Sequence, residues 1–134
     1  MDRITLVTGG SRGIGAATAR YLVDAGALVT ICGRRQDSIY LIGLELGPAC
    51  HVVQGDITLD VDRKRILDSA LAHGNGLDGL VNNAGNMYRA ALADLDESAL
   101  MEVFHQNVIG AMMMSSISAP ALAARGGSIV IIGS

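Results

Sequence analysis

A glycine-rich segment near the amino terminus, Thr8-Gly9-Gly10-Ser11-Arg12-Gly13-Ile14-Gly15, constrains this chain more than any other feature. The apolar run 4–7 precedes it and a helical pattern follows it, which predicts a strand, a tight turn and the start of a helix. The first N–H groups of a helix lack intrahelical partners and lie at the positive end of the helix dipole, so they favour an anion. The segment therefore predicts a site for the pyrophosphate of a dinucleotide.

Three glycines of this segment are expected to have separate roles. Gly9 is expected to adopt the positive φ of the turn, Gly13 to leave room that a Cβ would take from the ligand, and Gly15 to let the helix pack closely. The same pyrophosphate-binding segment includes Ser11, Arg12 and Ile14. The spacing is G-x-x-x-G-x-G rather than the general G-x-G-x-x-G, so the prediction depends on the strand before and the helix after.

Short apolar runs alternate with longer helical patterns along the chain, which predicts strand–helix–strand units and a parallel sheet. Strands are expected at 4–7, 28–32, 52–53, 80–81 and 129–132, and later helices at 38–46, 62–72 and 98–119. The apolar face of the first helix is expected to comprise Ile14, Ala17, Thr18, Tyr21, Leu22 and Ala25. Gly26 follows and is placed to end that helix in a left-handed conformation.

The composition is typical of one compact α/β domain. With 134 residues, 50% of them hydrophobic, and a net charge of -3, the chain suffices for one core and is too short for two. We find no basic excess for a nucleic-acid partner, no signal-peptide pattern, and no apolar stretch of the roughly 18 residues that a membrane span needs. Cys32 and Cys50 lack C-x-x-C spacing, which favours buried reduced thiols and a cytoplasmic location. His51, His73 and His105 are not at metal-ligand spacing, so no metal site is expected.

The segment after the second expected strand, Cys32-Gly33-Arg34-Arg35, bears on the choice of dinucleotide. An acidic residue at this point accepts from the ribose 2′-hydroxyl of NAD, whereas arginine accommodates the 2′-phosphate of NADP. No carboxylate stands here, two guanidinium groups follow Gly33, and Arg12 is close enough in the fold to assist. The sequence favours NADP over NAD. Alternatively, Arg34 and Arg35 only solvate the start of a helix, which leaves the preference open.

Further motifs make the chain resemble the N-terminal half of the short-chain dehydrogenase/reductase family. They are Thr8 to Gly15, Gly55-Asp56-Ile57, Asn82-Asn83-Ala84-Gly85, Asn107, and the run from Gly127 to Ser134. They occur in family order over all 134 residues. The resemblance implies a Rossmann-type doubly wound parallel sheet of order 3-2-1-4-5, an α/β dinucleotide-binding domain over 1–134 that stops after the fifth strand. The later part of the family fold is expected to be absent.

The resemblance also implies residue roles. Asp56 and Ile57 would border the adenine, Asn83, Ala84 and Gly85 would border the cofactor, Asn107 would support a water-linked proton path, and Ser134 would orient the substrate carbonyl. Each polar residue has a structural alternative. Asp56 is also typical of a turn or helix cap, Asn82 and Asn83 of turns with left-handed backbone, and Asn107 of an interruption in a buried helix.

One family motif is missing. The family supplies a proton from a tyrosine assisted by a lysine four residues later, on one helix face. The residues four beyond Tyr21, Tyr40 and Tyr88 are Ala25, Leu44 and Leu92, and Lys64 is the only lysine. Two hypotheses follow. The first is an NADP-dependent oxidoreductase acting on a small carbonyl or alcohol, in which this chain is the cofactor-binding part and inactive alone. The second is a non-catalytic dinucleotide-binding module that works with a partner chain.

Apolar surface is expected on the later part of the chain. Met112-Met113-Met114 lies on a helix that is apolar on more than one side and must be covered on both. The run 129–132 is expected to be an exposed strand edge. Both features predict a homo-oligomer or self-association through the long helix. By contrast, Asp62-Arg63-Lys64-Arg65 is expected to be a solvated helix face.

Overall fold

A computed structural model describes residues 3–133. Five parallel strands form one sheet in the order β3-β2-β1-β4-β5. They are β1 (Ile4–Thr8), β2 (Leu28–Gly33), β3 (Cys50–Gln54), β4 (Gly79–Asn82) and β5 (Ser128–Ile131). The predicted order is therefore confirmed, and β1 occupies the centre. All of its residues are buried, as expected for a strand covered on both faces.

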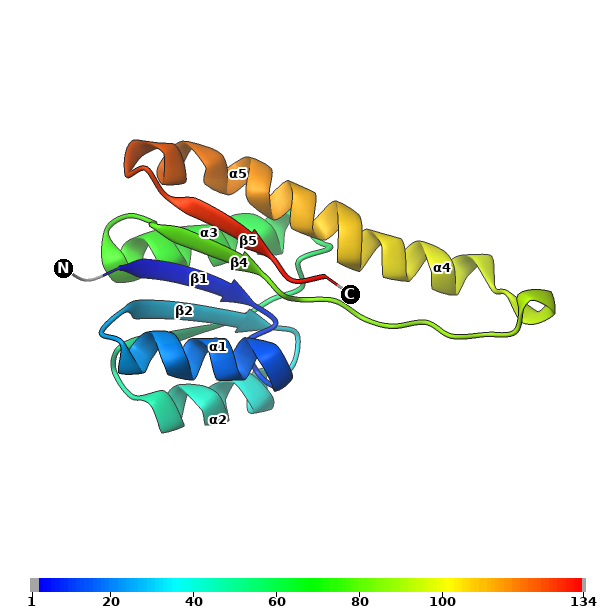
Figure 1. The fold of residues 1–134 in the computed structure, drawn as a ribbon, viewed down its shortest axis with the longest axis horizontal. Coiled ribbons are helices and arrows are strands. Elements are labelled where there is room, and N and C mark those ends of the chain that lie inside the picture. Colours follow the sequence, from blue (N-terminus) through cyan, green and yellow to red (C-terminus); the bar gives the residue numbers. More distant parts are fainter. Residues whose placement is uncertain (1–2, 134) are drawn as a thin grey trace.

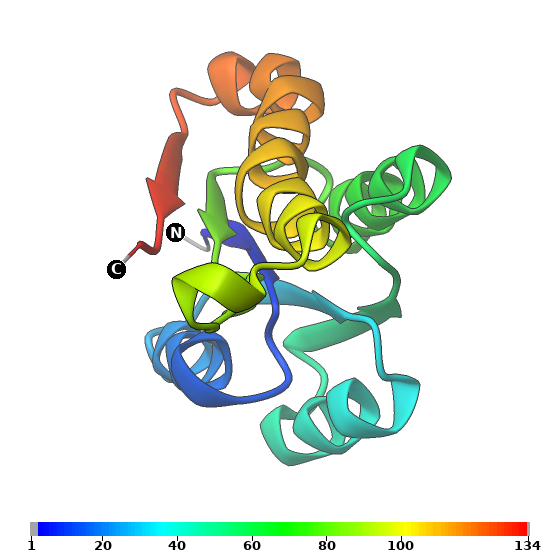
Figure 2. The same ribbon diagram turned by 90° about the vertical axis from the view of Figure 1, so that its right-hand side faces the viewer.

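Helices cover both faces of the sheet (Figures 1 and 2). α1 (Gly13–Asp24) and α2 (Gln36–Leu46) lie on one face, while α3 (Asp60–Gly74) and α5 (Gly110–Ala124) lie on the other. Each face has its own apolar cluster. Ile31 and Ile39 lie in the cluster under α1 and α2, whereas Leu6 and Met114 lie in the cluster under α3 and α5. This is the doubly wound arrangement that the alternating pattern predicts.

The buried face of α1 differs from the predicted one. Ile14 and Tyr21 are 60% and 74% exposed, and Ala17 and Ala25 are exposed as well. The buried positions are instead the small residues Gly15, Ala16 and Ala19. Small side chains let the helix axis approach the sheet, so close packing decided the face rather than the larger apolar side chains. Gly26 follows the helix with φ 94°, which confirms the predicted left-handed end.

A single long helix runs from α4 (Glu97–Phe104) through a π-helical turn (His105–Ile109) into α5. Asp96 begins it, because its carboxylate accepts a hydrogen bond from Ala99 N at 3.0 Å. The helix was expected to end at 119, but it continues through Pro120 to Ala124. Pro120 is exposed, and Leu122, two residues further, is 4% exposed against the sheet. Burial of Leu122 offsets the one backbone hydrogen bond that proline removes.

This long helix also revises the expectation about membrane-spanning segments. Residues Glu97–Ala124 include an 18-residue window of mean hydropathy 1.3, so by length and composition alone the helix could cross a membrane. Polar residues are interspersed along this helix, so its apolar character is not evident as one continuous run in the sequence. Met114, Ser118 and Leu122 face the interior of the domain, as in a helix that covers a sheet.

The outer side of the domain near β5 and α4 is apolar and exposed. All four residues of β5 are exposed, including Ile131 at 67%, and β5 pairs only with β4 among the residues described. α4 and the segment before it extend beyond the sheet (Figure 1). The predicted exposed edge is confirmed.

Candidate functional site

The glycine turn connects the end of β1 to the start of α1. Gly9 and Gly13 have φ of 65° and 56°, values that glycine adopts without strain. Arg12 occupies the N-cap position, and its side chain caps no backbone group. The first N–H groups of α1 therefore remain available at the positive end of the helix dipole, as an anion site requires.

Gly13 and Gly15 are needed for opposite reasons. A Cβ on Gly13 would meet nothing within 4 Å, so it would project into open space. A Cβ on Gly15 would collide with the carbonyl oxygen of Gly9 and lie 2.5 Å from Asn83 Nδ2. Gly15 thus permits close packing, as predicted, although its neighbours are the turn and the end of β4 rather than a strand side chain.

Thr8, the last residue of β1, links the turn to the segment after β4. Its hydroxyl oxygen accepts hydrogen bonds from Asn83 N at 3.1 Å and Ala84 N at 3.0 Å, and it donates to Val81 O at 3.4 Å. These bonds use both lone pairs and the proton of the hydroxyl. Asn83 Nδ2 adds a bond to Gly9 O at 3.0 Å. No role of its own was predicted for Thr8 from the sequence. A hydroxyl residue at the end of an apolar strand was the signal that could have indicated one.

These elements surround a cleft of about 470 Å³ at the carboxyl ends of the strands. Eleven of the thirteen predicted cofactor-binding residues line it: Gly9, Ser11, Arg12, Gly13, Ile14, Arg34, Arg35, Ile57, Asn83, Ala84 and Gly85. Gly15 lies behind the turn, and Asp56 is outside the lining. The remaining lining residues are Cys32, Gly33, Ser38, Gly55 and Gln106. Of these, Ser38 and Gln106 were missed, because each lies in a helix whose approach to the cleft depends on the tertiary fold.

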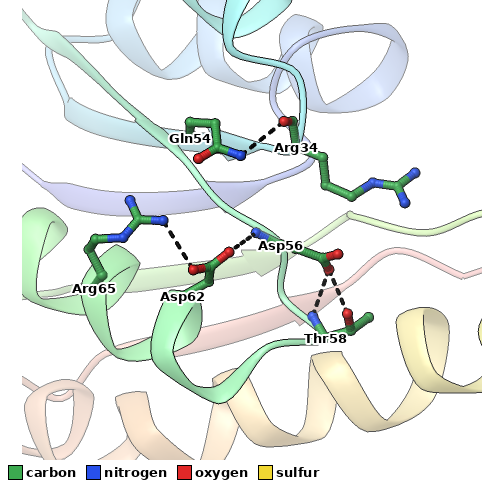
Figure 3. Close-up of polar contacts among 6 residues, drawn as sticks. All are labelled: Arg34, Gln54, Asp56, Thr58, Asp62 and Arg65. Atoms are coloured by element: carbon green, nitrogen blue, oxygen red, sulfur yellow. Dashed lines mark hydrogen bonds and ion pairs between the residues drawn. The ribbon is translucent and has the colours of Figure 1, made fainter.

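The cleft is cationic at one end. Arg12, Arg34 and Arg35 line it, and no acidic side chain does so among residues 3–133. Gln54 Nε2 donates to the carbonyl oxygen of Arg34 at 3.1 Å, which fixes the backbone of this segment (Figure 3). Arg35 Nε lies 3.9 Å from Asp37 Oδ1, and both side chains are more than three-quarters exposed. Such an exposed pair is weak, so Arg35 retains freedom to turn toward the cleft.

Asp56 is engaged in a local turn (Figure 3). Its carboxylate accepts from Thr58 N at 2.9 Å and from Thr58 Oγ1 at 2.7 Å, while its N–H donates to Asp62 Oδ2 at 2.8 Å. This is the turn-forming alternative for Asp56. The hydrogen bond from Asp56 N, followed by the nearby Arg65, lowers the pKa of Asp62 against an opposing effect of burial.

The two residues expected to take part in catalysis are placed differently. Asn107 lies in the π-helical turn, where its Oδ1 accepts from Asn86 N at 2.7 Å and its Nδ2 donates to Asn86 O at 2.8 Å. It thereby braces the segment after Gly85, which lines the cleft, without lining the cleft itself. Ser134 lies outside the described residues.

Both cysteines are buried free thiols, as predicted. Burial raises the pKa of Cys32 to about 12, opposed by a smaller effect of a hydrogen bond with the Gly9 backbone. Burial also raises the pKa of Cys50 to about 11. Both thiols are therefore protonated at neutral pH and weak nucleophiles. Among residues 3–133, no three His, Cys, Asp or Glu side chains are grouped to hold a metal ion.

The run from Asp62 to Arg65 is not a uniformly solvated helix face. Arg63 has a side chain only 8% exposed, and its Nη1 donates to the carbonyl oxygen of Ile57 at 2.8 Å. Lys64 and Arg65 are exposed, at 65% and 46%, and they pair with Asp60 and Asp62. The helical period therefore turns one residue of this charged run inward, behind the wall of the cleft.

Comparisons with known proteins show which family and which relatives this chain matches. The family of short chain dehydrogenases matches residues 3–134. Oxidoreductase asL5 of Sarocladium schorii is 34% identical over 133 residues, which is 98% of this chain and 53% of that protein. Dehydrogenase/reductase SDR family member 4 of Rattus norvegicus is 34% identical over 140 residues, or 98% of this chain and 48% of the relative. The chain spans about half the length of these curated relatives.

A solved structure is also similar. It is the crystal structure of 3-ketoacyl-(acyl-carrier-protein) reductase from Brucella melitensis complexed with NADH. The TM-score is 0.93 at 26% sequence identity, and the match covers 98% of this chain and 57% of that one. The likeness therefore extends over nearly the whole domain described above.

Proposed function

This chain belongs to the short-chain dehydrogenase family, and from that premise we propose that it forms the cofactor-binding part of an NADP-dependent oxidoreductase. The reaction would interconvert a small carbonyl compound and an alcohol by hydride transfer. The observation that carries the proposal is the cleft of about 470 Å³, which joins a glycine turn to a cationic end. It lies at the carboxyl ends of parallel strands, where sheets of this order bind nucleotides.

The residues present fit a nicotinamide dinucleotide. The open space beside Gly13, at the start of α1, has the position and polarity that a pyrophosphate needs. From there, one side of the cleft leads to Arg34 and Arg35 and the other to Asn83, Ala84 and Gly85. An extended dinucleotide would lie across these two sides. The NADH bound to the Brucella reductase supports this class of ligand.

The preference for NADP rests on charge. Gly33 stands at the end of β2, where an acidic residue would bind the ribose of NAD and repel a 2′-phosphate. Charge-assisted hydrogen bonds contribute roughly 1.5–3 kcal/mol each, and less at exposed side chains. Because Arg34 and Arg35 are exposed and Asp37 is near Arg35, we expect NADPH to bind about tenfold more tightly than NADH, or about 1.4 kcal/mol.

When bound, the nicotinamide supplies the hydride. The residues of this chain would bind and orient the cofactor, with the α1 amides holding the pyrophosphate and Asn107 bracing the segment that borders the nicotinamide side. A proton donor for the alkoxide is the missing element, since the sequence contains no Tyr-x-x-x-Lys. We therefore propose that the 134-residue chain binds cofactor without turnover.

The same absence supports a second candidate, a non-catalytic dinucleotide-binding module that works with a partner chain. The exposed β5 edge favours it, because a parallel edge strand of this kind offers unpaired backbone groups to another chain. The two candidates share the cofactor site and differ in whether the active protein carries the proton donor on the same polypeptide.

Isothermal calorimetry of the folded chain with NADPH and NADH at one salt concentration tests the proposal. We expect heat from both nucleotides and a dissociation constant for NADPH about tenfold smaller. Absence of heat from either nucleotide, in a sample that unfolds cooperatively, would contradict the cofactor site. Steady oxidation of NADPH with a panel of ketones would contradict the proposed lack of turnover and leave the site intact.

A further inference from the structure

The loop from Gly55 to Leu59 forms one wall of the cleft. Gly55 and Ile57 line it, and Gly55 N donates to the carbonyl oxygen of Gly33 at 2.9 Å, which ties the loop to the end of β2. In a doubly wound sheet the ribose of a bound adenosine lies at the end of this second strand. Because β3 is the next strand outward, its loop lies where the base would project beyond the ribose.

Two consecutive residues in the first turns of α3 hold this loop from behind. Asp62 Oδ2 accepts a hydrogen bond from Asp56 N at 2.8 Å (Figure 3). Arg63 Nη1 donates to Ile57 O at 2.8 Å. Asp62 thus restrains the N–H group of Asp56, and Arg63 restrains the carbonyl group of the next loop residue, Ile57. The far side of Ile57 is also confined, since its Cδ1 lies 2.9 Å from the position of a Cβ on Gly110.

The side chain of Arg63 is buried, which is energetically unfavourable for a cation. A role in positioning the loop would explain why it is there. Its side chain is 8% exposed, and its Nε is buried without a partner among residues 3–133. The nearest carboxylate, Asp60, is 3.7 Å from Nη2, is 60% exposed and is shared with Lys64 at 3.0 Å. A buried guanidinium with so little compensation contributes poorly to stability. By comparison, the hydrogen bond from Arg63 to the Ile57 carbonyl is short, at 2.8 Å.

We infer that Arg63 is a positioning residue for the adenine end of the cofactor cleft, an inference that rests on the nucleotide site proposed above. Arg63 holds the Ile57 carbonyl toward α3. This contact fixes the loop backbone and keeps the Ile57 side chain against the core. The wall therefore presents a constant shape to a planar base. Ile57 is 4% exposed, so its side chain is packed within this wall. Arg63 does not line the cleft and would act only through Ile57.

The substitution R63M separates positioning from stability. Methionine matches the length of the arginine stem and removes the buried charge, a change that is often neutral or stabilising for the fold. We expect an unchanged or higher unfolding midpoint in urea. We also expect about a tenfold weaker affinity for 2′,5′-ADP, which carries adenine, and no change for inorganic pyrophosphate, which reports on the glycine turn alone. K64M removes a neighbouring charge that does not reach Ile57 and should change neither affinity.

Three outcomes would overturn the inference. They are unchanged 2′,5′-ADP binding by R63M, equal losses for 2′,5′-ADP and pyrophosphate, and an equal effect of K64M. If wild-type protein binds neither probe, the proposed cofactor site fails instead. Should R63M not fold, NMR of labelled wild-type protein decides: 2′,5′-ADP should shift the Ile57 carbonyl and Arg63 Nε resonances, whereas pyrophosphate should not. Absence of those shifts on saturation with 2′,5′-ADP contradicts the inference.

Discussion

Asn83 Nδ2 donates a hydrogen bond to the carbonyl oxygen of Gly9 at 3.0 Å, across 74 positions of sequence. This bond joins the glycine turn after β1 to the segment after β4, and so links two sides of the cleft. The amide occupies the space that a side chain on Gly15 would need. The hydrogen bond of Asn83 to Gly9 therefore requires a residue without a Cβ at position 15.

Substitution of Asn83 by alanine should loosen this arrangement. We expect the free energy of unfolding to fall by about 1 kcal/mol, the usual net contribution of one hydrogen bond. NADPH affinity should fall by about tenfold, because the turn amides lose their fixed orientation. Calorimetry and urea denaturation measure the two effects. N86A is the control: within residues 3–133 the Asn86 side chain accepts only from Met87 N, and the bonds with Asn107 use the Asn86 backbone. Equal effects of N83A and N86A would contradict the prediction.

Two glycines with positive φ at opposite ends of α1 allow a matched comparison. Gly13 and Gly26 have φ of 56° and 94°, and at each a Cβ would meet nothing within 4 Å. G13A and G26A should each lower the free energy of unfolding by about 1–2 kcal/mol through backbone strain alone. Only G13A should weaken binding of NADPH, because its methyl group enters the cleft. A similar loss of NADPH affinity in G26A would show that strain in α1, rather than access to the cleft, controls binding.

The paired substitution R34S and R35S should remove the preference for NADP. We expect NADPH affinity to fall about tenfold and NADH affinity to stay within about twofold, since NADH carries no 2′-phosphate. The preference of wild-type protein should also decline with added salt, because exposed charges are screened. R20S is the control for loss of a cation, as Arg20 pairs with Glu45 at 2.7 Å and does not line the cleft. Equal losses of NADPH and NADH affinity would assign these arginines a general structural role.

The sequence alone predicts those parts of the site that depend on local backbone chemistry. Gly9 is predictable because a turn between a strand and a helix requires positive φ, which glycine adopts without strain. Gly13 is predictable because a Cβ at the start of the helix would take space from the ligand. The strand order follows from family resemblance and is confirmed. Arg34 and Arg35 are predictable as lining residues because they directly follow a buried strand whose carboxyl end borders the site.

Other features depend on packing between distant segments and were not predictable. The face of α1 was predicted wrongly because Gly15 and Ala19 fit the close approach to the sheet better than Ile14 or Tyr21. Arg63 carries a charge, so its sequence neighbours indicated a solvated position. Its partner, the Ile57 carbonyl, is only six positions away, but the turn before α3 that brings the two together was not predicted. The Thr8 hydroxyl likewise gains its partners from a segment 75 and 76 positions away.

A pair of histidines should make stability depend on pH. The rings of His51 and His73 stack with centroids 5.3 Å apart. Stacking shields one ring face from water, and this desolvation, followed by the charge of His73, lowers the pKa of His51 from 6.5. The unfolded chain therefore binds a proton more readily than the folded one. Stability from this source is fully present above pH 6.5 and declines as pH falls through the lowered pKa of the folded state.

Urea denaturation at several pH values between 5 and 8 measures this effect. H51Q should show a flatter dependence of the unfolding free energy on pH than wild-type protein. H105Q alters an exposed histidine in the π-helical turn and should keep the wild-type slope. Identical slopes for wild type and H51Q would show that the stacked pair does not contribute.

The outer side of the long helix should mediate self-association, as we propose from its apolar stripe. Met101, Phe104, Val108 and Met112 recur at helical spacing and are 66%, 58%, 43% and 66% exposed. An exposed stripe of this kind is favourable only when covered, and a second copy of the same helix offers a complementary surface. M112K would place a charge within that contact. It should shift the chain to a smaller species in sedimentation velocity runs at matched concentrations, with no loss of NADPH binding.

Y40K introduces the same charge at an exposed apolar position on α2, across the sheet, and should leave the mass unchanged. If M112K and wild type sediment alike as oligomers, the contact lies elsewhere, with the exposed β5 edge as the next surface to test by I131K.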